Sequence, residues 1–61
     1  MGDEFVRKAL ELLIDKAETQ EDFDLIKYTI DDYLYEGYRI RSVVPKYNAK
    51  YQDWVEQTNL N

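Results

Sequence analysis

The side chains able to do chemistry in this chain are carboxylates and tyrosines, because it holds thirteen Asp and Glu and six Tyr residues but no Cys or His. Thiol nucleophiles, disulfides, haem ligation, Cys/His zinc sites and His-based triads are therefore excluded. A carboxylate pair could act as acid and base or bind a metal ion, but 61 residues can hardly enclose a pocket of the usual size. We expect no enzyme activity, no metal site and no cofactor.

One set of acids and tyrosines lies along a single line of a helix. The spacing is i, i+4, i+7 and i+11, and the residues are Asp24, Tyr28, Asp31 and Tyr35. Asp32 lies beside this line. Tyrosine offers a large contact area at low entropic cost, and carboxylates attract cationic surfaces and pair with Arg. The pattern predicts a surface that binds a basic partner protein, such as a nucleic-acid-binding protein, although the tyrosines could instead pack against a second chain or the connector.

The C-terminal part carries a second candidate surface, which is basic and aromatic. Its bases are candidates for binding an anion or a nucleic acid: Arg39, Arg41, Lys46 and Lys50, with Tyr38 before them and Tyr47 among them. One interpretation is a short helix over 40–46, a turn at 47–49 and a following helix that ends at Trp54 and Val55. This spacing resembles the helix-turn-helix of small DNA-binding domains.

In that arrangement three residues would face the DNA groove, namely Lys50, Gln52 and Asp53, while Arg39, Arg41 and Lys46 would lie near phosphates. Two observations oppose it. Pro45 would fall inside the first helix, at a cost of about 3 kcal/mol or more, and the net charge of −5 disfavours approach to DNA. The bases could instead balance the acidic half of the same fold.

Charge is divided unequally along the chain. Residues 1–36 contain four bases and eleven acids, a net charge of −7, whereas residues 37–61 contain four bases and two acids, a net charge of +2. An acidic first half joined to a mildly basic, aromatic second part suggests interaction surfaces of opposite sign.

Three amphipathic segments must position these side chains. The first is a helix over about 3–18, whose apolar residues recur at helical spacing: Phe5, Val6, Ala9, Leu10, Leu13, Ile14 and Ala17. Leu12 widens this apolar arc to about 200°. One neighbouring helix cannot cover so wide an arc, so either two helices flank this segment or part of it contacts a second chain.

The second segment is a helix over about 20–36. Thr19 and Asp22 have the spacing of a capping box, and Gly37 stands where a left-handed residue would end the helix, with Tyr38 placed to fold back on Tyr33. Residues 37–44 form a connector that is extended or a short helical turn, because a second strand to pair with it is lacking. Pro45 favours a third helix over about 45–58.

That third helix carries an aromatic stripe at helical spacing: Tyr47, Tyr51, Trp54, Val55 and Thr58. The sequence therefore predicts an all-α fold, a small three-helix bundle in a single domain over 1–61, with the stripe buried between the first two helices. Neither a membrane span nor a signal peptide is expected, so the expected location is the cytoplasm.

The expected function is that of a small acidic protein-interaction module, a regulator or inhibitor of the kind found in bacteria and phages, that binds a basic protein through the acidic tyrosine line. DNA binding through residues 38–55 is one alternative. Homodimerisation is another, since the wide apolar arc and the aromatic composition suit a chain that completes its core with a second copy.

Overall fold

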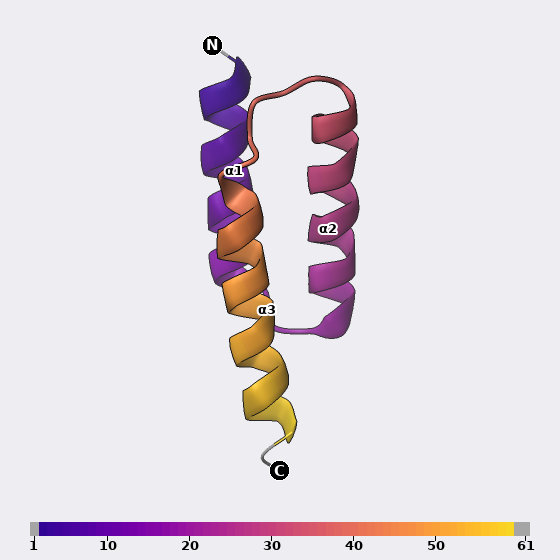
Figure 1. The fold of residues 1–61 in the computed structure, drawn as a ribbon. Helices are drawn as coiled ribbons and strands as arrows, with labels where there is room; N and C mark the ends of the chain where they lie inside the picture. Colours follow the sequence, from indigo (N-terminus) through magenta and orange to yellow (C-terminus); the bar gives the residue numbers. More distant parts are fainter. Residues whose placement is uncertain (1, 60–61) are drawn as a thin grey trace.

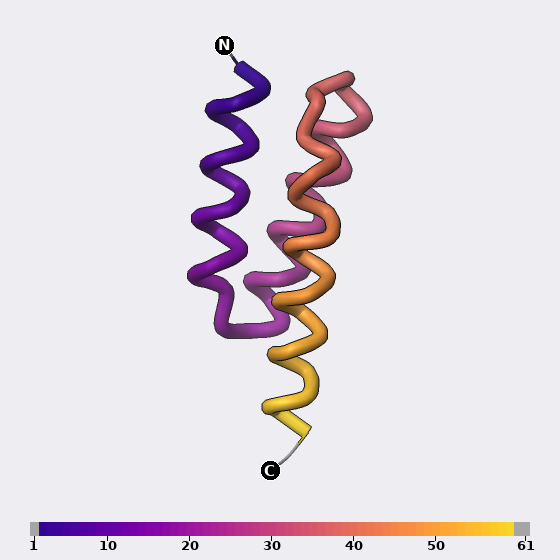
Figure 2. Tube along the Cα trace, turned by 60° about the vertical axis from the view of Figure 1, so that its left-hand side comes forward, coloured from indigo at the N-terminus to yellow at the C-terminus, as the bar shows by residue number. Residues whose placement is uncertain are grey.

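The computed structural model describes residues 2–59 as three helices: α1 (Gly2–Lys16), α2 (Gln20–Tyr35) and α3 (Val43–Asn59). Helices α1 and α2 form an antiparallel hairpin, and α3 runs back along it in the direction of α1 (Figures 1 and 2). The predicted small all-α bundle is confirmed. The lower end of α3 extends past the loop that joins α1 to α2, which makes the molecule elongated, 42 Å long and 16 × 15 Å across.

A capping box begins α2, as the sequence predicts. The Thr19 hydroxyl accepts a hydrogen bond from the Asp22 N–H at 3.1 Å, and the Asp22 carboxylate accepts from the Thr19 N–H at 3.2 Å. The same carboxylate also accepts from the Glu18 N–H at 3.0 Å. These bonds satisfy backbone donors that the first helical turn leaves free, and they end the short loop after α1.

The pKa of Asp22 makes this cap sensitive to acid. The Glu18 N–H, and less strongly Thr19, donate to the carboxylate and lower its pKa below the usual range, although partial desolvation opposes the shift. Because the folded-state pKa is depressed, this stabilisation is fully present above the unfolded value of about 3.9. It is lost as the pH falls through the folded-state pKa.

We therefore expect the difference in melting temperature between the wild type and Asp22→Asn to be largest near neutral pH and to shrink as the pH falls below about 4 and through the folded-state pKa. The neutral amide can still accept hydrogen bonds but lacks the charge that the backbone donors favour. Thermal unfolding of both proteins, followed by circular dichroism across this range, checks the expectation. A difference that stays constant with pH would contradict it.

Gly37 ends α2 in the left-handed conformation, with φ of 95°. The Gly37 N–H donates to the Leu34 carbonyl and the Tyr38 N–H to the Tyr33 carbonyl, both at 3.0 Å, which is the Schellman pattern. The rings of Tyr33 and Tyr38 then meet edge to face with centroids 4.9 Å apart. The predicted helix end and the fold-back of Tyr38 onto Tyr33 are both confirmed.

Replacing Gly37 by Ala should destabilise the fold by about 1–2 kcal/mol, the cost of holding an L-residue in the left-handed region. A Cβ at this position would meet nothing within 4 Å, so the cost is conformational rather than steric. Gly2→Ala is the matched control, because its Cβ would lie 3.5 Å from the Tyr38 ring, an ordinary contact. Urea denaturation should show a loss for Gly37→Ala and none for Gly2→Ala; equal stability of the two variants would contradict this account of the turn.

Helix α3 begins at Val43, two residues before the predicted start. Pro45 is its third residue and so lies in the first turn, where a missing N–H costs no hydrogen bond. The Val43 and Val44 N–H groups donate to the Ile40 and Arg41 carbonyls, both at 3.0 Å, so a tight turn leads directly into the helix. The connector is therefore shorter than the predicted 37–44, and it combines an extended piece with a helical turn.

The core lies between the three helices and under the connector. Its buried members are Leu10, Ile14, Ala17, Phe23, Ile26, Ile30, Ile40, Val43 and Tyr47. Phe23 is the largest fully buried side chain, and three aromatic rings of α3 pack around it. The predicted burial of the α3 aromatic stripe is confirmed for Tyr47, whereas Tyr51, Trp54 and Val55 are half-buried and Thr58 is exposed. Three residues of the predicted apolar arc of α1, Phe5, Leu12 and Leu13, are exposed instead.

Candidate protein-binding site

The acidic tyrosine line predicted from the sequence lies on the outer surface of α2. All five of its candidate residues are exposed: Asp24, Tyr28, Asp31, Asp32 and Tyr35. The two tyrosines are unusually open, with 72% of Tyr28 and 93% of Tyr35 exposed. Neither ring therefore packs against the connector, which was one of the two competing explanations for these residues; packing against a second chain was the other. Large aromatic rings held in solvent on a rigid helix are typical of contact residues.

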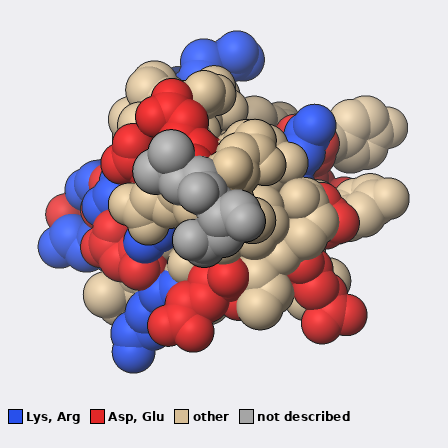
Figure 3. All heavy atoms as spheres, turned by 90° about the horizontal axis from the view of Figure 1, so that it is seen from below, with Lys and Arg blue, Asp and Glu red and all other residues tan. Residues whose placement is uncertain are grey.

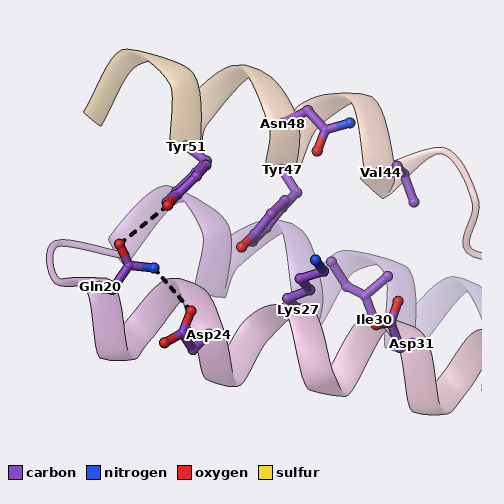
Figure 4. A pocket seen from close by; sticks show the side chains of 9 residues that line it. All are labelled: Gln20, Asp24, Lys27, Ile30, Asp31, Val44, Tyr47, Asn48 and Tyr51. Atoms are coloured by element: carbon purple, nitrogen blue, oxygen red, sulfur yellow. Dashed lines mark hydrogen bonds between the residues drawn. The ribbon is translucent and has the colours of Figure 1, made fainter. Parts of the chain in front are cut away.

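A recess of about 360 Å³ lies between α2 and α3, next to this line (Figure 4). Asp24, Lys27 and Asp31 line it from α2, while Tyr47 and Tyr51 point toward it from α3. Asp24, Lys27, Tyr28 and Asp31 also line a second, more open hollow of about 480 Å³ on the outer side of α2. Because the two hollows share Asp24, Lys27 and Asp31, they form one continuous surface, which we call the acidic recess.

Hydrogen bonds fix one end of the acidic recess. The Gln20 amide donates to an Asp24 carboxylate oxygen at 2.9 Å, and its carbonyl oxygen accepts from the Tyr51 hydroxyl at 3.2 Å (Figure 4). This bridge ties the first turn of α2 to the middle of α3. It holds the Asp24 carboxylate and the Tyr51 ring in place before any ligand arrives, which reduces the entropy lost on binding.

The carboxylates of the acidic recess differ from those of α1 in their ion pairing. Within residues 2–59, the four ion pairs with N–O distances up to 4.0 Å all use acids of α1: Arg7–Glu4, Arg7–Glu11, Lys8–Glu4 and Lys46–Asp15. Asp24 and Asp31 are in none of these pairs, although Lys27 lies between them on the same helix. Both carboxylates thus keep their charge available for a cation from outside.

The negative charge of the acidic recess extends to Tyr47. Burial raises the pKa of the Tyr47 hydroxyl, and the neighbouring Tyr51 phenol and the negative charges of Asp24 and Asp31 raise it further. Tyr47 stays protonated and donates a buried hydrogen bond to the Phe23 carbonyl at 2.9 Å. The same potential that disfavours a tyrosinate here favours a cationic group in the recess.

The residues that line the acidic recess differ from the binding residues predicted from the sequence: several are new, and two of the predicted ones lie outside it. Gln20, Lys27 and Tyr51 belong to the acidic recess but were absent from the predicted binding residues. The spacing places Lys27 three residues after Asp24 and four before Asp31, so helical geometry alone could have found it. Tyr51 could not be found this way, because it comes from another helix and was assigned to the core. Asp32 and Tyr35 line neither hollow.

The basic candidates do not form a common surface. Lys46 makes an ion pair with Asp15 at 3.4 Å, and the Lys50 ammonium donates to the Asp15 carbonyl at 2.9 Å. Both lysines therefore bind the C-terminal end of α1, while Arg39 and Arg41 are exposed in the connector. In the end-on view most bases lie on one side of the bundle and acids are spread around it (Figure 3). Lys46 and Lys50 therefore offset negative charge within the same fold, which was the alternative to anion binding.

The helix-turn-helix interpretation of residues 40–55 is wrong in its geometry. Helix α3 runs without a break from Val43 to Asn59, so the expected turn at 47–49 is a helical segment instead. The physical reason is the position of Pro45: it begins this helix rather than interrupting an earlier one. A groove-reading helix that starts after residue 49 is therefore absent from the described part of the chain.

Residues 2–59 contain no group of three or more acids placed to bind a metal ion together. None of the three described helices combines the length and apolar character that crossing a bilayer requires. No protein-family model, curated protein or solved structure matches the chain.

Proposed function

We propose that this chain is a protein-interaction module that acts in the cytoplasm as a regulator or inhibitor and binds a basic protein through the acidic recess and the exposed tyrosines of α2. The observation that carries the proposal is the pair Asp24 and Asp31. They line a preformed recess beside the exposed Tyr28, and neither forms an ion pair among the described residues.

The chemistry of the recess favours an arginine-bearing partner. A guanidinium can bind a carboxylate in a bidentate manner and stack on an aromatic ring, whereas a lysine ammonium acts as a point charge. Asp24 and Asp31 supply the carboxylates, and Tyr28 and Tyr51 supply the rings within the same surface. Tyr35, farther along α2, extends the contact area beyond the recess. Nucleic-acid-binding proteins have such arginine-rich surfaces, so they are the expected partner class.

Substituting both Asp24 and Asp31 by Asn should lower affinity for the partner by at least about 100-fold, because two charge-assisted contacts of about 1.5–3 kcal/mol each are lost. Both side chains are exposed, so helicity and melting temperature should remain close to those of the wild type. The partner is first captured from a lysate of the source cells, with and without nuclease, and identified by mass spectrometry. Its affinity for each variant is then measured by calorimetry.

The matched control is Asp53→Asn with Glu56→Gln, which removes the same two charges from exposed positions on α3 outside both hollows. This control should bind like the wild type. Equal losses in the two double variants would show that overall charge, not the acidic recess, attracts the partner. Unchanged binding by the Asp24→Asn and Asp31→Asn variant would contradict the proposal outright.

A further inference from the structure

A second surface, on the side of the hairpin formed by α1 and α2, carries exposed apolar side chains. Phe5 is 74% exposed, and Leu12 and Leu25 are each 61% exposed. Leu13, half exposed, lines two shallow hollows that α1 and α2 form together, one of about 240 Å³ shared with Leu25 and one of about 130 Å³ shared with Phe5. We call these four residues the apolar face. Contiguous apolar side chains of this size on a surface mark an interaction site.

Charges of opposite sign border the apolar face on its two helices. On α1, Lys8 and Lys16 stand four residues before and four after Leu12, so the three share one line of the helix. On α2, Glu21 stands four residues before Leu25 and Asp32 seven residues after it. All four charged residues are exposed. Each helix thus presents an exposed leucine between two like charges, positive on α1 and negative on α2.

The charged residues of α1 and α2 also lie at matching positions along the long axis of the bundle. Lys16 lines one hollow together with Asp22 and Leu25, so the end of α1 is level with the start of α2. Phe5 and Ala9 line the other hollow together with Thr29 and Tyr33. Lys8, which lies between Phe5 and Ala9 in the sequence, is therefore level with the segment that contains Asp32.

We propose that a second copy of this chain covers the apolar face, related to the first by a two-fold axis parallel to the helices. Such an axis places α1 of one copy against α2 of the other, and it leaves the position of every residue along the helix direction unchanged. Lys16 then faces Glu21 of the second copy, and Lys8 faces Asp32 of the second copy. Symmetry repeats both pairs, so four attractive charge pairs surround the exposed leucines and phenylalanines.

Charge selects this arrangement over the other symmetric one. A two-fold axis perpendicular to the helices would place α1 against α1 of the second copy, with Lys8 opposite Lys16, and like charges that close cost several kcal/mol. The existing Lys8–Glu4 pair does not prevent the proposed contact, since both side chains are about two-thirds exposed and such surface pairs contribute little. The dimer leaves the recess between α2 and α3 open, with its carboxylates Asp24 and Asp31. Tyr28 and Asp32, two of the candidate protein-binding residues, lie on the same line of α2 as Leu25 and would be covered in part. The dimer rests on the apolar face and its charged borders, not on the proposed function.

Sedimentation equilibrium on the wild type and on two charge-reversed double variants tests the dimer. Lys8→Glu with Lys16→Glu, and Glu21→Lys with Asp32→Lys, should each raise the dimer dissociation constant at least tenfold, because each places like charges across the interface. An equimolar mixture of the two variants should restore dimers. In that mixture both interfaces again join a positive border to a negative one.

Two controls separate this interface from other effects. Arg39→Glu with Arg41→Glu changes the net charge by the same amount as Lys8→Glu with Lys16→Glu, but at positions in the connector. This control should dimerise like the wild type. Leu12→Gln with Leu25→Gln should be monomeric at concentrations where the wild type is dimeric, and should retain its helicity, since both leucines are exposed. A wild type that remains monomeric up to about 1 mM, or a mixture that fails to restore dimers, would overturn the proposal, whatever else covers the face.

Discussion

Replacing Phe23 by Ala is expected to destabilise the fold by about 3–5 kcal/mol. Phe23 has no exposed surface, and its ring centroid lies 5.9, 5.1 and 5.2 Å from those of Tyr47, Tyr51 and Trp54. The Phe23 ring is therefore the contact through which α2 holds the aromatic stripe of α3. At about 0.05–0.15 kcal/mol per residue, a domain of this length has roughly 3–9 kcal/mol of stability. The variant is expected to be largely unfolded at the low end of that range.

Trp54 is the only tryptophan, so its fluorescence in a urea titration reports this loss directly. Tyr35→Ala is the matched control because it removes an aromatic ring of similar size from the same helix, at a position that is 93% exposed. Its stability should stay within about 0.5 kcal/mol of the wild type. A Phe23→Ala variant as stable as Tyr35→Ala would refute the packing described here.

Replacing Trp54 by Ala is expected to cost about 3 kcal/mol, the lower end of the range for large core aromatics, because the ring is half-buried. Its ring is tilted against Phe23 and stacked on Tyr51, with a centroid distance of 5.9 Å in the second case. Its indole N–H donates to the Glu18 carbonyl at 2.9 Å, which ties α3 to the loop between α1 and α2. Far-UV circular dichroism during thermal unfolding measures the loss.

Trp54→Phe is the informative second variant. It keeps most of the ring contacts with Phe23 and removes the indole donor to Glu18, so its stability should fall between those of Trp54→Ala and the wild type. A Trp54→Ala variant that stays fully folded but loses partner capture would instead make Trp54 a contact residue. In that case the binding surface would include the lower end of α3.

The helices and their ends could be predicted because the signals are local. Thr19 with Asp22 and Gly37 with Tyr38 each lie within a few residues of one another, so their backbone consequences follow from spacing alone. The start of α3 was missed by two residues because Pro45 is compatible with several positions in a first turn. Backbone hydrogen bonds to Ile40 and Arg41 decided among them, and these depend on how Ile40 is buried in the core.

The candidate site could be predicted only on the helix that carries it. The periodicity of α2 correctly placed Asp24, Tyr28 and Asp31 on one exposed line. It could not show that Tyr51 completes a recess with them, because a periodic pattern gives the faces of each helix but not the rotation of one helix against another. The same limit explains Phe5 and Leu13, whose apolar positions on α1 exceed the area that α2 and α3 cover.

Cationic side chains should bind the acidic recess in preference to the other acids of the chain. Titrating the isotopically labelled protein with a hexa-arginine peptide, and following backbone amide resonances by NMR, tests it most directly. The largest shifts are expected at Asp24, Lys27, Tyr28, Asp31 and Tyr51. Shifts of equal size at Glu4, Glu11, Asp53 and Glu56 would contradict it, because they would show that the peptide follows net charge rather than the recess.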